Sequence, residues 1–176
     1  MTPGLNIDMS KKSDFNISFL IAVGKTRWFQ GEEKQNDDFL NQGLKAKMPK
    51  NQIFEINSLI FNITKHKKEI LTKYKCIYDE INNSLSILLC EDLCFADFTK
   101  EIMLNLLEFA KKVEIETIYF LVAKKNAQYI KMVQDLMIVG FEVDEKNKNV
   151  NIDGCTYKVL KLPVKEQDDD IEEIFL

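Results

Sequence analysis

The sequence predicts an α/β fold of the α+β kind, in which a mixed β-sheet packs against two main helices within a single domain. Three observations predict it. Several short runs rich in β-branched and aromatic residues are separated by turn residues, as strands are. Two longer segments carry apolar residues at helical spacing. A short apolar run lies between these segments, so strand–helix–strand pairs are embedded among hairpins, which indicates parallel and antiparallel pairing in one sheet.

The first two strands are expected between Ile53 and Ile81. Ile53 to Thr64 and Lys73 to Ile81 mix β-branched and aromatic residues with polar ones, as half-buried strands do. Asn82-Asn83 is a suitable hairpin turn, and it leads into a third expected strand from Ser84 to Cys90.

The next segment is expected to be a helix whose N-terminus is capped by Asp97 or Thr99, since an oxygen-bearing side chain there accepts an otherwise unpaired backbone N–H. Its apolar stripe consists of Met103, Leu106, Leu107, Ala110 and Val113. The opposite face is expected to present Glu101, Asn105, Glu108 and Lys112, with the last two spaced for an i,i+4 ion pair.

A buried strand from Ile118 to Ala123 and a second helix from about Asn126 are expected to follow. The apolar stripe of this helix consists of Tyr129, Met132, Val133, Leu136 and Met137. Gly140 should end it, because glycine adopts the left-handed conformation without strain, and Phe141 should begin another strand. Asp153-Gly154 predicts a hairpin turn into a last strand from Cys155 to Leu162.

Three regions are expected along the chain. Residues 1–50 hold two of the three prolines and long polar runs, so we expect a mostly flexible segment. Residues 51–164 form the α/β domain, and residues 165–176 form an acidic tail that includes EQDDDIEE from Glu166 to Glu173. On this division, the helices and strands that could form a rigid surface for docking another protein lie after Asn51. A shortened chain beginning there should therefore keep such a surface.

Composition narrows the classes of function. The net charge is −4 with a pI near 5.2, which argues against a nucleic-acid partner. No apolar run is long enough for a membrane span, so no membrane partner is expected. The cysteines lack zinc-site spacing and are expected to be buried free thiols in a cytoplasmic protein, with the nucleus left open as a second location. They are Cys76, Cys90, Cys94 and Cys155.

Catalytic motifs are hard to find in this sequence. The expected sheet is compatible with an acyltransferase fold, but Lys124 to Gln128, before the second helix, has no glycine with which to cradle the pyrophosphate of coenzyme A. The single histidine, His66, lies in a run of lysines, and neither a GxSxG elbow nor a phosphate loop of the GxxxxGK kind occurs. We therefore predict a chain that is not an enzyme, with no catalytic residue, no cofactor and no metal.

Two motifs at a particular spacing add a resemblance to a known family. Leu106 to Ala110 (LLEFA) and Gly140 to Glu142 (GFE) resemble the motifs of the first and second helices of the ornithine decarboxylase antizymes, at the family's spacing. Thr99-Lys100-Glu101 and Lys124 match further positions, Cys155-Thr156-Tyr157 resembles the family's last strand, and Arg27-Trp28-Phe29 is similar to its Arg-Trp element.

This resemblance implies a noncatalytic inhibitor with an acyltransferase-like (GNAT-like) fold. Such a protein binds ornithine decarboxylase monomers, blocks their homodimerisation, and directs the enzyme to the proteasome without ubiquitin. It thereby restrains polyamine synthesis and uptake, and its own synthesis depends on ribosomal frameshifting. The implied partners are ornithine decarboxylase in a heterodimer, the antizyme inhibitor where one exists, and the proteasome. A small-molecule acyltransferase and an unrelated adaptor domain of the same fold are the alternatives.

The resemblance also implies a partner-binding surface, made by Lys100, Glu108, Lys111, Lys112 and Lys124. Lys111 and Lys112 depart from the family, which has two glutamates after LLEFA. Two positive charges would repel a basic patch on an unchanged partner, so either the partner or the contact has changed. Lysines near the C-terminus of a helix are also favourable with its dipole, which is an alternative reason for their presence.

Overall fold

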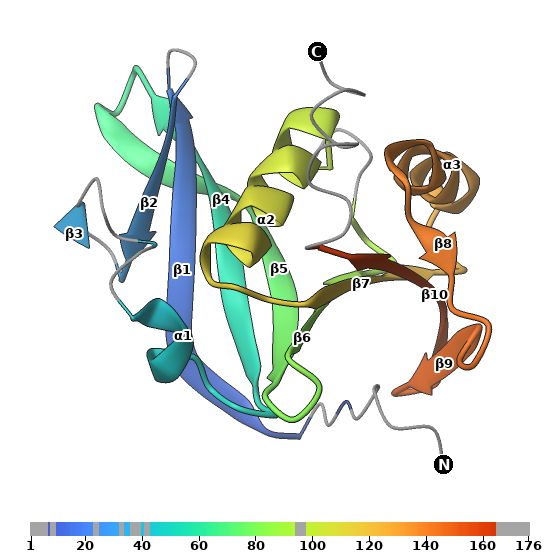
Figure 1. Ribbon diagram of the computed structural model, residues 1–176. Helices are drawn as coiled ribbons and strands as arrows, with labels where there is room; N and C mark the ends of the chain where they lie inside the picture. Colours follow the sequence, from blue (N-terminus) through green and yellow to red (C-terminus); the bar gives the residue numbers. More distant parts are fainter. Residues whose placement is uncertain are drawn as a thin grey trace.

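The computed structural model describes residue 7 and residues 10–22, 25–31, 34–35, 40, 43–93 and 98–164. This part of the chain forms one mixed sheet with two longer helices and one short helix (Figure 1). The elements are β1 (Lys12–Ala22), β2 (Lys25–Gln30), β3 (Lys34–Gln35), α1 (Leu44–Lys47), β4 (Ile53–Asn62), β5 (Lys67–Asp79), β6 (Ser84–Leu89), α2 (Lys100–Lys112), β7 (Thr117–Ala123), α3 (Tyr129–Val139), β8 (Glu142–Val143), β9 (Asn149–Ile152) and β10 (Cys155–Pro163).

The strands follow the spatial order β3-β2-β1-β4-β5-β6-β7-β10-β8, and β9 pairs with β10. Two neighbouring pairs are parallel, β1 with β4 and β6 with β7, while the other pairs are antiparallel. The crossover between β6 and β7 is α2, which Figure 1 shows lying across one face of the sheet. The expected fold class, a mixed α/β sheet packed with two main helices, is confirmed.

The main core lies between the sheet and the two longer helices. Strand residues alternate between the two faces of a sheet, so Ile17, Phe19 and Ile56 point toward the helices and are fully buried. Aromatic rings connect the layers: Phe19 lies 4.9 Å from Trp28, and Trp28 stacks at 5.3 Å on Phe109 of α2. A smaller apolar cluster on the other face includes Leu121, Tyr157 and Val159.

Local signals at the ends of several elements are confirmed. Thr99 Oγ1 accepts a hydrogen bond of 3.2 Å from the backbone N–H of Ile102, and thus caps α2. Gly140 ends α3 with φ of 118°, a conformation that side-chain-bearing residues rarely adopt. Asp153 and Gly154 both have positive φ, as the tight turn between β9 and β10 requires.

The expectation that residues 1–50 are mostly flexible is wrong for the described part of this segment. β1 pairs with β4 over Asn16 to Leu20, and β2 pairs with β1, so the sheet extends well before the expected boundary at Asn51. Trp28 and Phe29 of β2 are buried. The acidic tail, at residues 165–176, lies outside the described residues.

Smaller corrections concern the ends and faces of elements. β5 begins at Lys67, earlier than the expected Lys73, because the run of lysines pairs with the end of β4. α3 begins at Tyr129, since Asn126 is used in the preceding turn. Asn105 of α2 is buried, although its spacing had placed it on the outer face, and its Nδ2 donates to the carbonyl of Glu101. Within the described residues, no helix combines the length and apolar character needed to span a membrane.

Candidate functional site

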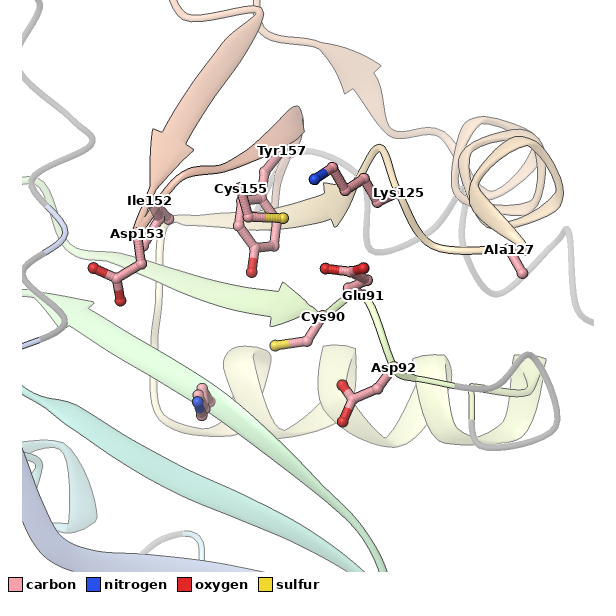
Figure 2. Close-up of a pocket in the computed structure, with 10 residues that line it drawn as sticks. Cys90, Glu91, Asp92, Lys125, Ala127, Ile152, Asp153, Cys155 and Tyr157 are labelled. Atoms are coloured by element: carbon pink, nitrogen blue, oxygen red, sulfur yellow. The ribbon is translucent and has the colours of Figure 1, made fainter.

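A cavity of about 610 Å³ lies at the carboxyl ends of the parallel strands β6 and β7 (Figure 2). Ligand sites in α/β sheets commonly occupy this position, because the loops that follow parallel strands diverge there. The lining residues come from β5, from the loops that follow β6 and β7, and from the β9–β10 hairpin with the first residues of β10. They are Lys75, Cys90, Glu91, Asp92, Lys125, Ala127, Ile152, Asp153, Cys155 and Tyr157.

Tyr157 holds a central position in this cavity. It pairs with Ala123 of β7, and Cys90 follows directly on Leu89, which pairs with Val122. The backbones of Tyr157 and Cys90 are therefore separated by two strand spacings, roughly 10 Å, a gap that the tyrosine ring can span over the small Ala123. Figure 2 shows the Tyr157 hydroxyl between the sulfur atoms of Cys90 and Cys155, and it is hydrogen-bonded to both thiols.

Burial sets the protonation of this group of side chains. Burial raises the pKa of the Tyr157 phenol, and the neighbouring Cys90 and Cys155 thiols raise it further. Burial also raises the pKa of the Cys90 thiol, although Lys75 and the hydrogen bond from Tyr157 act in the opposite direction. At neutral pH both Tyr157 and Cys90 are therefore uncharged, and the Cys90 sulfur serves as a hydrogen-bonding partner rather than as a thiolate.

Asn126 fixes the two loops that border the cavity. Its Nδ2 donates to the carbonyl oxygens of Cys90 and Leu93, each at 2.7 Å, while its Oδ1 accepts from the backbone N–H of Gln128, also at 2.7 Å. The side chain is buried and ties the loop after β6 to the loop after β7. In the sequence Asn126 marks only the approximate start of a helix, and its neighbours along the chain do not predict this role.

The charged side chains around the cavity are of both signs. The acidic side chains of its lining are Glu91, Asp92 and Asp153, and the basic ones are Lys75 and Lys125. In the described part of the chain, no group of three or more His, Cys, Asp and Glu side chains is arranged to hold a metal ion. The cavity therefore offers a neutral hydroxyl, two thiols and charges of both signs, which suits a small polar molecule.

The five residues expected to bind a partner lie elsewhere. Lys100 begins α2 and Lys124 follows β7, so both lie at the end of the sheet where β6 and β7 finish. Lys111 and Lys112 lie at the other end of α2, roughly 16 Å along the helix axis from Lys100. Glu108 lies on the same helix, between Lys100 and Lys111. All five side chains are exposed, and none of them lines the cavity.

The residues around Tyr157 were not expected as a site. Cys90 and Cys155 were expected to be buried free thiols; both are free and half-buried. Tyr157 entered the sequence argument only as part of the last strand's resemblance. The signal that could have found them is positional, since Cys90 ends a strand that leads into a crossover helix. Cys94 lies outside the described residues.

Comparisons with known proteins give two structural matches. No family model and no curated protein matches the sequence. A chain assigned as an acetyltransferase from T. thermophilus aligns with a TM-score of 0.44 and 17% identity, over 62% of this chain and 61% of that one. Nourseothricin acetyltransferase aligns with a TM-score of 0.38 and 14% identity, over 55% and 59% of the two chains. Each match thus spans about three fifths of the solved chain.

These matches correct one expectation from the sequence. The prediction that the chain is not an enzyme is overturned, because both matched chains are named acetyltransferases. They agree with an acyltransferase-like fold class. At such identities and TM-scores the likeness concerns the fold, so substrate and partner are matters of proposal.

Proposed function

We propose that this chain binds ornithine decarboxylase monomers and prevents them from forming the active homodimer, as the antizymes it resembles do. The proposal rests on the sequence resemblance, together with one structural observation. Segments that resemble the family, although distant in the sequence, are packed into one core between the sheet and its helices.

The contacts among these segments are specific. Trp28, from the Arg-Trp element, stacks on Phe109 of the LLEFA motif with ring centroids 5.3 Å apart and planes inclined by 25°. Phe141, from the GFE motif, meets Phe120 of β7 edge to face at 5.2 Å. Residues of all three segments belong to the same buried cluster. Motifs with a shared packing role are expected to occur together, which supports reading them as one signature.

The exposed side of α2 supports a docking role. Lys100, Glu108 and the Lys111-Lys112 pair remain exposed while the other side of the helix is buried. A helix that presents charges from a rigid, well-packed support is a suitable surface for recognising a folded partner. The two lysines favour a partner that is acidic where the helix ends. We extend the proposal to delivery of the decarboxylase to the proteasome, restraint of polyamine uptake, and competition by an antizyme inhibitor.

The test is to mix the chain with the ornithine decarboxylase of the same cell and to measure molar mass by light scattering. The proposal expects a complex of one copy of each chain to replace the decarboxylase homodimer, with loss of decarboxylase activity. A homodimer that persists at equal activity with excess chain present would reject it. Glu145→Ala, a change at an exposed glutamate outside α2, is a matched control for changes at Glu108.

A second candidate function is transfer of an acyl group to a small polar molecule, and the cavity at Tyr157 favours it. A buried, uncharged tyrosine hydroxyl can donate a proton to a leaving group. Calorimetry with acetyl-coenzyme A would test this candidate. Saturable binding, together with product formation that falls in Tyr157→Phe, would favour acyl transfer. Absence of both, combined with formation of the decarboxylase complex, would favour the first proposal.

A further inference from the structure

The face of the sheet opposite the helices carries a second hollow, of about 660 Å³, which we call the open-face hollow. It lies over β1, β4 and β5 and is defined here by Ser18, Asn57, Phe61, Lys68 and Lys73. Its position follows from strand alternation, because Ser18 lies between the core residues Ile17 and Phe19 and so points to the other face. Ser18 pairs with Asn57, and Asn57 pairs with Lys73.

The open-face hollow has a positive rim on a chain that is acidic overall. Lys67, Lys68 and Lys73 line it, against the single carboxylate of Glu55. Lys68 is held in place, since its Nζ lies 4.2 Å from the centre of the Phe29 ring. The nearby Glu69 carboxylate is bonded to Asn62 at 3.0 Å and to Lys65 at 3.2 Å and also attracts Lys67, so it offsets only part of the positive charge of this rim.

The same hollow also exposes apolar surface and contains a buried polar group. Phe61 is 51% exposed and Ile70 is 49% exposed, and both belong to its lining. Asn57 is only 5% exposed; its Nδ2 donates to Ser18 Oγ at 3.3 Å, while its Oδ1 has no hydrogen-bond partner among the described residues. A buried acceptor without a donor is costly, and an N–H from a bound molecule would satisfy it.

We infer that the open-face hollow binds an acidic peptide segment of a partner protein, in which apolar side chains accompany the carboxylates. The carboxylates pair with Lys67, Lys68 and Lys73, the apolar side chains cover Phe61 and Ile70, and a peptide N–H supplies the donor for Asn57. A phosphate group alone would leave the exposed Phe61 and Ile70 unused. A nucleic acid would meet the repulsion of a chain whose net charge is −4.

The test uses a short fluorescein-labelled peptide that alternates glutamate with leucine and phenylalanine, titrated with the full chain and followed by fluorescence anisotropy. We expect saturable binding that weakens by about tenfold or more in Lys67→Glu/Lys73→Glu, because attraction becomes repulsion. Lys146→Glu/Lys148→Glu makes the same change of charge at exposed positions outside the hollow and should bind like the parent. Phe61→Ser should weaken binding without removing its dependence on salt.

Three further probes decide the chemistry. A peptide with lysine in place of glutamate should not bind, and an all-glutamate peptide should bind more weakly than the mixed one. Equal binding of either would overturn the inference, as would tighter binding of a single-stranded oligonucleotide. Circular dichroism of each variant confirms that it is folded. The open-face hollow lies on the face opposite α2, so this result is independent of whether the chain inhibits ornithine decarboxylase.

Discussion

The two faces of the sheet differ in what they bury, although the same strands build both. The helix-covered face holds an aromatic core in which Phe19, Trp28 and Phe109 are in contact. The other face combines an apolar cluster around Tyr157 with hollows that are lined by charged and polar side chains. Because side chains alternate along each strand, the helix-covered face mainly stabilises the fold and the other face is available for recognition. A substitution should therefore affect mainly stability or mainly binding, depending on the face to which its side chain points.

Removing the N-terminal strands should give the largest effect on the helix-covered face. A shortened chain that begins at Asn51 loses β1, which pairs with β4, and loses Trp28, which covers Phe109. We expect it to lose its cooperative thermal transition, because the edge of β4 and part of the core become exposed. The sequence alone had predicted that this shortened chain keeps the docking surface. A cooperative thermal transition close to that of the parent chain would instead support the prediction from sequence that residues 1–50 are not part of the fold.

Trp28→Ala tests how much a single side chain on the helix-covered face contributes to stability. It removes a side chain that is 6% exposed and packed on Phe19 and Phe109, so unfolding in urea should show a loss of about 3–5 kcal/mol. Phe61→Ala, on the open face at 51% exposure, is the control and should cost less than about 1 kcal/mol. Similar losses for the two variants would contradict the division between the faces.

Asn126→Ala should have an intermediate effect at the candidate cavity. The change removes three hydrogen bonds of 2.7 Å, leaves the carbonyls of Cys90 and Leu93 without this donor, and leaves the backbone N–H of Gln128 without this acceptor. We expect a loss of about 1–3 kcal/mol and faster amide exchange in the loops after β6 and β7. Gln128→Ala, at an exposed neighbouring position, should show neither change.

Tyr157→Phe should have the smallest effect, and it should appear only in alkali. Burial raises the pKa of Tyr157 in the folded state, so the folded protein binds a proton that the unfolded chain releases above about pH 10. Stability therefore falls as the pH rises past this value. Tyr157→Phe lacks the titrating group, and its urea midpoint should fall less steeply over the same range. Parallel pH profiles would show that Tyr157 is not responsible.

Much of the fold could be predicted because its signals are local. The Thr99 cap, the Gly140 terminus and the Asp153-Gly154 turn each depend on a few adjacent residues. β1 was missed although Phe15, Ile17, Phe19 and Ile21 alternate with other residues, because Asn16 and Ser18 interrupt what would otherwise be an apolar run. In a strand with one polar face, such residues are expected at alternate positions.

The cavity could not be predicted in the same way, because it depends on the order of the strands. Cys90 and Tyr157 meet only since β10 returns beside β7, which places them two strands apart. The residues expected to bind a partner are exposed, as a docking surface requires, yet Lys100 and the Lys111-Lys112 pair lie at opposite ends of α2. A partner must therefore extend along the helix to contact both.

The most direct test of the proposed function is titration of the same cell's ornithine decarboxylase with the chain while following decarboxylase activity. The parent chain should abolish activity near equal amounts of the two proteins. Equal inhibition by Lys100→Ala or by Glu108→Ala should require at least about tenfold more protein, because losing a charged contact commonly costs about 2–5 kcal/mol. Glu145→Ala should inhibit as well as the parent does. If the parent chain leaves the activity unchanged, or both α2 variants inhibit as well as the parent does, the proposed decarboxylase-binding surface is wrong.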